Sequence, residues 1–289
     1  MADRPERKAP RTAKLVVRRT EWVTPHLVRV VSAPEVPAEL DRFAASPYTD
    51  AYVKVVFRRP GVAYPEPFDM AAVRQRLPRE QWPALRTYTL REVDRTAGEI
   101  VIDFVYHGDV GLAGPWAAAA RPGTELLVLG PGGGYAPDPA ADWHLLAGDE
   151  SALPAIAAAL AEIPPGVVAH ALVEVADAAD EQPLSTPGEP RVRWVHRSIT
   201  GQDGLVDAVR ALEFPPGRVH AFVHGEAGAV RHLRRHLLDE RGLSLDQLSI
   251  SGYWRRGMDD ESWRAIKAVE AQADAEADGQ AVRRAPQPT

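Results

Sequence analysis

The 289-residue sequence contains no cysteine, and that absence removes several kinds of chemistry at once. It excludes a disulfide framework, a thiolate zinc site, an iron–sulfur cluster and a thiol nucleophile. Any redox chemistry therefore needs a bound organic cofactor or a metal held by other ligands. Long apolar runs are also missing, and the Arg/Lys/Pro-rich segment 1–19 lacks the apolar stretch of a secretion signal. We expect a cytoplasmic protein with no membrane partner.

The charge balance is mildly acidic. The chain has 34 Lys and Arg against 40 Asp and Glu, a net charge of −6, which argues against nucleic-acid binding. A hydrophobic content of 45% over this length suits two modest domains better than one large core. We expect domains over 12–137 and 138–258, then a C-terminal helix and disordered tail over 259–289, and a monomer.

Short strands separated by turn residues fill the first half of the chain. The expected strands are 15–17, 27–31, 52–57, 87–93, 99–106 and 125–129. Apolar residues alternate most clearly over 99–106, as they do on a strand with one buried face. Six strands without long helices between them predict a small antiparallel barrel.

Beyond residue 139 strands alternate with helices. Strands are expected near 144–147, 167–175, 191–196, 219–224 and 248–254, with helices over 151–163, 205–212 and 227–241. Such alternation predicts a doubly wound parallel sheet. The whole chain therefore has the layout of a flavin reductase that takes hydride from a nicotinamide. It would be an antiparallel β-barrel FAD-binding domain followed by an α/β parallel-sheet nicotinamide-binding domain.

The hexapeptide Arg-Thr-Tyr-Thr-Leu-Arg at 86–91 lies on an expected strand. A flavin needs an aromatic plane over its ring, a hydroxyl near its reactive nitrogen and cations for its pyrophosphate. Tyr88 and Thr89 would supply the first two. Arg86 and Arg91 would supply the cations, with Thr87 between them. An ordinary half-exposed strand with charged edges is the alternative.

This hexapeptide resembles the flavin motif of the siderophore-interacting protein family, a branch of the ferredoxin reductase superfamily. Four further segments resemble that family in the expected order: Tyr52–Val55, His107-Gly108 with Gly114–Ala117, Gly148–Pro154 and Gly252–Gly257. The resemblance covers roughly residues 18–257. It implies FAD as cofactor, NADPH or NADH as electron donor with ferredoxin as a further candidate, and a ferric siderophore as substrate.

The Gly- and Pro-containing segment 107–120 opens a short helix. Backbone N–H groups at such a place can seat a pyrophosphate. The run Leu112–Ala117 lacks the hydroxyl that the family usually carries there, so we expect backbone contacts. The expected contacts come from His107, Gly108, Gly114, Trp116 and Ala117. A barrel loop with a helical plug is the alternative, and His107 is equally consistent with a structural histidine.

The turn 148–154 lies between the first parallel strand and its helix, where open α/β sheets bind nucleotides. Ser151 is expected to cap the helix. Asp149 and Glu150, however, put negative charge where a pyrophosphate would lie. Either these carboxylates cap the helix and bind a ribose, or nicotinamide binding is weak.

The electron donor is left open by the sequence. Glu174 at a strand end could take ribose hydroxyls, which would favour NADH. Arg193 and Arg197 could instead meet a 2′-phosphate, which would favour NADPH.

Three cations complete the expected site. The family resemblance implies that Lys54, Arg255 and Arg256 dock an anionic ferric complex, since a cationic mouth raises its local concentration. Three unrelated surface cations are the alternative. His232 and His236 have a spacing able to bind metal, but no acidic partner follows, so we predict no metal site. Two rival functions remain: a general flavin or ferredoxin-type reductase, and a non-enzymatic siderophore-binding flavoprotein.

Overall fold

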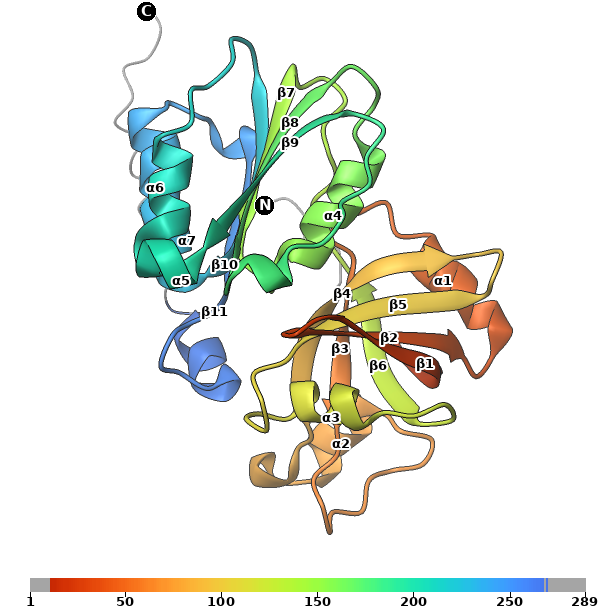
Figure 1. Cartoon of the computed structure of the whole chain (residues 1–289). Helices are drawn as coiled ribbons and strands as arrows, with labels where there is room; N and C mark the ends of the chain where they lie inside the picture. The colour runs from red at the N-terminus through yellow and green to blue at the C-terminus, as the bar shows by residue number, and fades with distance from the viewer. Residues whose placement is uncertain (1–10, 268, 270–289) are drawn as a thin grey trace, which may run out of the picture.

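The computed structural model describes residues 11–267 and 269, and its first half is a closed antiparallel barrel (Figure 1). Its strands are β1 (Thr12–Thr24), β2 (Leu27–Pro34), β3 (Tyr52–Phe57), β4 (Ala84–Asp94), β5 (Glu99–Val105) and β6 (Glu125–Gly132). They follow the order β1-β2-β5-β4-β3-β6, and β6 pairs back with β1. Closure removes free sheet edges, which explains how so small a barrel is stable.

Alternating residues of the strands fill the barrel. On β5, Ile100, Ile102 and Phe104 are fully buried in the core, as the sequence pattern predicts. The helix α3 (Ala113–Ala119) plugs the barrel through Ala117. Two further helices, α1 (Leu40–Ala44) and α2 (Met70–Arg76), lie in the connections on either side of β3.

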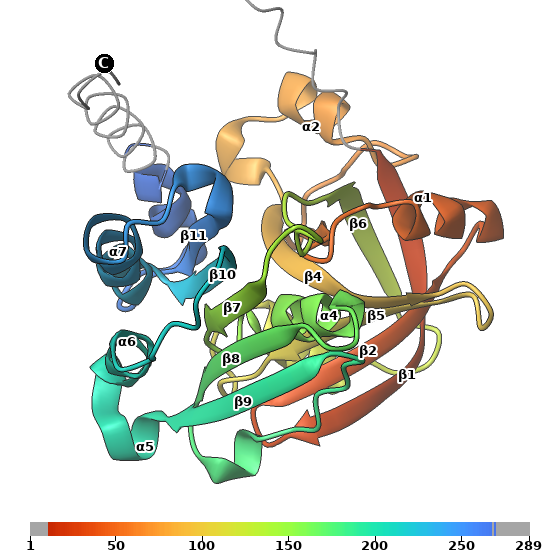
Figure 2. The same ribbon diagram turned by 90° about the horizontal axis from the view of Figure 1, so that it is seen from above.

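The second half is a parallel five-stranded sheet with helices on both faces (Figure 2). Its strands are β7 (Trp143–Gly148), β8 (Val168–Val175), β9 (Glu189–His196), β10 (Val219–Glu226) and β11 (Leu248–Trp254). One face is covered by α4 (Leu153–Glu162), and the other by α6 (Gly204–Arg210) and α7 (Ala227–Arg235). The short α5 (Arg197–Thr200) follows β9. Barrel and sheet confirm the predicted fold.

The strand order β11-β10-β7-β8-β9 determines where this sheet can bind a ligand. The chain leaves β7 toward β8 and β9 and later returns to its other side as β10. The carboxyl ends of β7 and β10 therefore form the topological switch point, where open sheets of this type bind ligands. In this chain that edge faces the barrel, which puts any ligand between the two halves.

Several expected boundaries are corrected by the structure. The helix expected over 151–163 begins at Leu153, and the one expected over 227–241 ends at Arg235 and continues as a π-helical turn, His236–Glu240. His236 in that turn bonds Glu240 at 2.7 Å, so an acidic partner does follow it, contrary to the expectation from the sequence. The expected C-terminal helix begins at residue 260 and runs through 267, while the predicted disordered tail lies outside the described residues.

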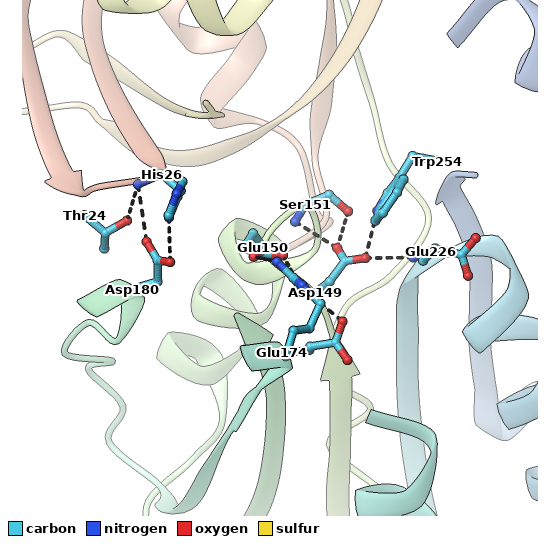
Figure 3. Close-up of polar contacts among 10 residues, drawn as sticks. Thr24, His26, Asp149, Glu150, Ser151, Glu174, Asp180, Glu226 and Trp254 are labelled. Carbon is cyan, nitrogen blue, oxygen red and sulfur yellow. Dashed lines mark hydrogen bonds and ion pairs between the residues drawn. The ribbon is translucent and has the colours of Figure 1, made fainter. Parts of the chain in front are cut away.

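A hydrogen-bonded contact between His26 and Asp180 joins the two halves (Figure 3). Nδ1 of His26, at the β1–β2 turn, lies 2.8 Å from Oδ2 of Asp180, which follows β8. The backbone N–H of His26 donates to the other oxygen at 3.3 Å. Asp180 is only 3% exposed, so this contact holds the barrel against the sheet away from the site.

Candidate functional site

A cavity of about 970 Å³ lies between the barrel, the carboxyl edge of the parallel sheet and the C-terminal helix 260–267. That volume is at the upper end of the roughly 300–1,000 Å³ typical of ligand pockets. The barrel contributes β3 and β4, the sheet contributes the ends of β7, β10 and β11, and the helix contributes four side chains. The space therefore has room for a large cofactor and for a second ligand beside it.

The strand β4 carries the predicted flavin motif into this cavity. Arg86, Thr87, Tyr88 and Thr89 all line it. The Tyr88 ring packs at 4.3 Å, centroid to centroid, on Phe104 of the barrel core. Burial raises the pKa of the Tyr88 phenol, which therefore stays neutral. Tyr88 thus presents a firmly backed aromatic plane to the cavity.

Arg91 remains available for an anion. It falls at an irregularity in the pairing of β4 with β5, and such bulges redirect side chains. Burial lowers its pKa, and Asp103 opposes this effect. Asp103 itself is held by Arg29 at 2.7 and 2.8 Å. Arg91 makes no hydrogen bond or ion pair with any residue in the described part of the chain, although it does not line the cavity directly.

Arg86, the other expected phosphate ligand, is already engaged. Its guanidinium donates to Glu261 at 2.8 and 3.0 Å and to Asp260 at 3.2 Å. Arg264 reaches Asp260 at 2.8 Å, and Trp263 on the same helix is buried. Arg86 therefore fixes the C-terminal helix to β4, a role that the sequence did not indicate.

The segment 107–120 meets the cavity only at His107. Gly108 and Gly111 have positive φ angles in open space, as a tight loop requires. Gly114 instead lets α3 approach β5, since a Cβ there would lie 3.0 Å from the Val105 carbonyl oxygen.

The next two residues of that segment belong to the barrel core. Trp116 packs edge-on against Phe57 and near Phe104, and Ala117 is fully buried. Neither side chain lines the cavity, although both were expected near the cofactor. Their apolar surface is used to plug the barrel.

Asp149 occupies the switch point between β7 and β10 (Figure 3). One carboxylate oxygen accepts the N–H and O–H of Ser151 at 2.9 and 2.5 Å. The other accepts the Glu226 N–H and the Trp254 indole N–H, both at 2.8 Å. Burial raises the pKa of Asp149, and these donors oppose that shift. The expected cap at Ser151 is wrong, because its hydroxyl donates to Asp149 instead of accepting from the helix.

Glu150 is neutralised by Arg197, the residue that follows β9. The guanidinium of Arg197 binds both oxygens of Glu150, one at 2.8 Å, and reaches Glu174 at 3.1 Å. Arg193, the other arginine considered for a 2′-phosphate, is exposed on β9 and does not line the cavity. The structure thus brings Glu150, Glu174 and Arg197 into one cluster and leaves Arg193 outside it.

Six cations line the cavity, and three of them, Arg86, Arg197 and Arg264, form ion pairs with nearby carboxylates. The other three are Lys54, Arg256 and Lys267. Lys54 lies opposite Thr87 in the β3–β4 ladder, and Arg256 donates to Gln202 at 2.5 Å. Lys267, which the sequence reasoning missed, donates to the Gly252 carbonyl at 2.8 Å, and burial lowers its pKa. Arg255 lies over the Trp263 ring and does not line the cavity. Only the return of the terminal helix places Lys267 here, so no local pattern signals it.

Two buried histidines make stability sensitive to pH. Burial lowers the pKa of His144 to about 4 and that of His224 to about 3, from an ordinary value of 6.5. Because both folded pKa values are depressed, their contribution is complete above pH 6.5 and is lost as pH falls toward 4. Between pH 6.5 and the folded pKa, each unit of pH decrease lowers the free energy of unfolding by roughly 1.4 kcal/mol per histidine.

Denaturant unfolding at pH 7.5 and pH 5 measures this effect. We expect a free energy of unfolding lower by about 2 kcal/mol at pH 5 for each histidine. His144→Asn should reduce the difference between the two pH values by about 2 kcal/mol, whereas His232→Asn, at an exposed site, should leave it unchanged. An unchanged pH dependence in His144→Asn would contradict the assignment.

No metal site or membrane-crossing helix is found in the described part of the chain. No group of three or more His, Asp or Glu there is arranged to hold a metal ion. No helix among those residues is long and apolar enough to cross a membrane.

Comparison with known proteins matches both halves of the chain. Residues 16–135 match the family model of the siderophore-interacting FAD-binding domain, and residues 141–257 match that of the siderophore-interacting protein. An uncharacterized Mycobacterium tuberculosis protein is 45% identical, over 89% of this chain and 94% of that one. The ferric vibriobactin reductase ViuB of Vibrio cholerae is 36% identical over 66% of this chain and 71% of its own.

Comparison with solved structures agrees with these family matches. A siderophore utilization protein from T. fusca is 36% identical with a TM-score of 0.74, covering 88% of this chain and 97% of that one. SipS of Aeromonas hydrophila is 30% identical with a TM-score of 0.75, covering 91% and 99%. A flavohemoglobin from Malassezia yamatoensis, 16% identical over 84% of this chain and 60% of its own with a TM-score of 0.60, shares the fold.

Proposed function

The chain belongs to the siderophore-interacting protein family, and on that premise we propose that it is an FAD-dependent reductase of ferric siderophores. One observation carries the proposal: a single cavity holds the flavin strand β4 and the cations Lys54, Arg256 and Lys267. A cofactor on β4 and an anionic iron complex on the cations would share one space. Electron transfer between them would then need no movement of either half of the protein.

The residues present fit FAD. Tyr88 offers a rigid ring, Thr89 a buried hydroxyl and Arg91 a guanidinium with no partner among the described residues. A guanidinium binds phosphate oxygens in a bidentate manner, which suits the pyrophosphate of FAD. When bound, FAD supplies the ability to accept two electrons from a donor and to deliver them singly to Fe(III).

The protein itself would orient the siderophore beside the flavin and attract it electrostatically. Lys54, Arg256 and Lys267 would attract a siderophore that carries several negative charges and hold its iron near β4. Iron reduced to Fe(II) binds hard oxygen donors more weakly, so it leaves an intact chelator. No side chain has to donate or remove a proton at the iron.

The electron donor is proposed to be NADPH or NADH, bound at the carboxyl edge of the parallel sheet. This edge supports the proposal because its switch point opens on the same cavity as β4. Ferredoxin is the alternative donor, since the Asp149 carboxylate lies at the switch point where a pyrophosphate would otherwise bind. We further propose that the protein works in the cytoplasm as a monomer.

Turnover with three acceptors tests the function. The reductant concentration is kept the same for all acceptors. The purified protein is then expected to reduce a ferric catecholate siderophore with a kcat/KM at least tenfold above that for free flavin as the acceptor. Ferricyanide serves as an acceptor that any reduced flavoprotein can use. Equal or lower efficiency with the siderophore would support a general reductase. Binding of the siderophore without any turnover would indicate a non-enzymatic flavoprotein.

A further inference from the structure

Three adjacent strand ends meet in the cluster Glu150, Glu174 and Arg197. Figure 3 labels its two carboxylates. Glu150 follows β7, Glu174 lies at the end of β8 and Arg197 follows β9, and these strands are neighbours in the sheet. In open α/β sheets the adenosine ribose of a dinucleotide lies at this edge. An acidic residue there binds the ribose hydroxyls of NADH, while an arginine accommodates the 2′-phosphate of NADPH. This chain has both residue types at the edge.

The contacts decide which of them is available. The two terminal nitrogens of Arg197 donate to both oxygens of Glu150, and one of them also donates to Glu174. The side chains of Glu150 and Glu174 are 10% and 8% exposed, so both carboxylates depend on this guanidinium. A 2′-phosphate bound to Arg197 would have to share its single positive charge with two buried carboxylates, which is unfavourable.

The charge of the cluster has the same consequence. Two carboxylates against one guanidinium leave it net negative, with Asp149 beside it, whereas a 2′-phosphate carries a charge of about −2. A ribose diol is uncharged and donates hydrogen bonds. Glu174 keeps one buried oxygen, Oε2, without a hydrogen-bond partner among the described residues. The cluster can therefore accept a hydrogen bond from a ribose hydroxyl. It has no excess positive charge for a phosphate group.

We infer that Glu150 and Glu174, by engaging Arg197, make this chain select NADH over NADPH. The inference rests on the proposed function, since it specifies the donor of that reaction. It makes Glu174 and Glu150 determinants of specificity, with Arg197 as the residue through which they act. Arg256 also lines the cavity and donates to the uncharged Gln202, and the proposed function assigns its charge to the siderophore.

The first measurement is binding, which does not depend on turnover. Calorimetry on the FAD-loaded protein compares adenosine 5′-monophosphate with adenosine 2′,5′-bisphosphate. We expect the bisphosphate to bind at least tenfold more weakly, and kcat/KM to be at least tenfold higher for NADH than for NADPH. Equal binding of the two nucleotides, or tighter binding of the bisphosphate, would overturn the inference.

Variants then test the residues. Glu174→Gln and Glu150→Gln keep the side-chain shape and free part of Arg197, so each should shift the NADPH/NADH ratio at least tenfold toward NADPH. Glu181→Gln is the matched control, because Glu181 pairs with His196 at the end of β9 and not with Arg197. Flavin content and melting temperature show that each variant is folded. An unchanged ratio in both cluster variants would overturn the inference.

Failure here is separable from failure of the proposed function. If neither nucleotide binds, yet protein reduced by dithionite still reduces a ferric siderophore, the donor inference is wrong and the reductase stands. If the chemically reduced protein does not reduce the siderophore while the nucleotide preference is found, the reductase is wrong and the donor site stands.

Discussion

Arg91→Ala and Tyr88→Ala proteins are expected to lose most of their FAD during purification, while the wild-type protein is yellow. A charge-assisted hydrogen bond contributes about 1.5–3 kcal/mol and ring stacking about 1 kcal/mol beyond burial. Those values correspond to a dissociation constant for FAD raised roughly tenfold to a hundredfold for Arg91→Ala. For Tyr88→Ala the expected increase is about fivefold to tenfold. Absorbance near the flavin maximum after desalting, followed by titration with FAD, measures both.

Matched variants separate binding from folding. Arg95→Ala removes an exposed arginine near the end of the same strand, where it pairs with Asp41 away from the cavity, and should retain full FAD. Tyr88→Phe keeps the ring on Phe104 and should retain FAD as well. Tyr88→Ala also removes core packing, so its melting temperature must be compared with that of the FAD-free wild type. Full flavin retention in Arg91→Ala would contradict the assignment of Arg91 to the pyrophosphate.

Charge reversal at the cavity cations is expected to impair reduction of an anionic ferric siderophore. Lys54→Glu, Arg256→Glu and Lys267→Glu should each raise KM at least tenfold, equivalent to about 1.4 kcal/mol, with kcat nearly unchanged. Reduction of a neutral or cationic acceptor should stay nearly intact, because the flavin site is untouched. Raising the salt concentration should mimic the variants, since exposed charges are screened over about 10 Å at 0.1 M.

Arg255 tests the geometry of this docking site. Sequence reasoning placed it with Lys54 and Arg256, but the structure stacks it over Trp263 outside the cavity. Arg255→Glu is therefore expected to have the smallest effect of the four reversals, although it is the immediate neighbour of Arg256. Equal losses for anionic and cationic acceptors in Lys54→Glu and Lys267→Glu would contradict the docking site and leave the flavin site standing.

Much of the fold was accessible from the sequence because local patterns carry it. Alternation on β5, turn residues between short strands and the later strand–helix rhythm are all local signals. The family resemblance added the flavin strand, whose residues 86–89 do line the cavity. Helix ends were less accessible, because the first turn of α4 depends on Asp149 accepting from Ser151 and Trp254, a contact between β7 and β11.

The parts of the site that the sequence did not reveal depend on long-range contacts. Nothing local shows that residues 260–267 return to the flavin strand, where Arg86 binds Glu261 and Lys267 enters the cavity. Trp116 is an ambiguous case of a different kind. An aromatic residue beside a glycine-rich loop suits a cofactor or a core equally well, and only the packing on Phe57 and Phe104 decides it.

A single-turnover reaction under anaerobic conditions tests the central claim most directly. The FAD-loaded protein is reduced chemically, freed of excess reductant and mixed with a ferric catecholate siderophore and a ferrous-iron indicator. We predict that the oxidised flavin spectrum returns as the indicator forms its complex, with about two Fe(II) for each FAD. A flavin that stays reduced with the siderophore, yet is oxidised at once by ferricyanide, would contradict the claim that this protein is a ferric-siderophore reductase.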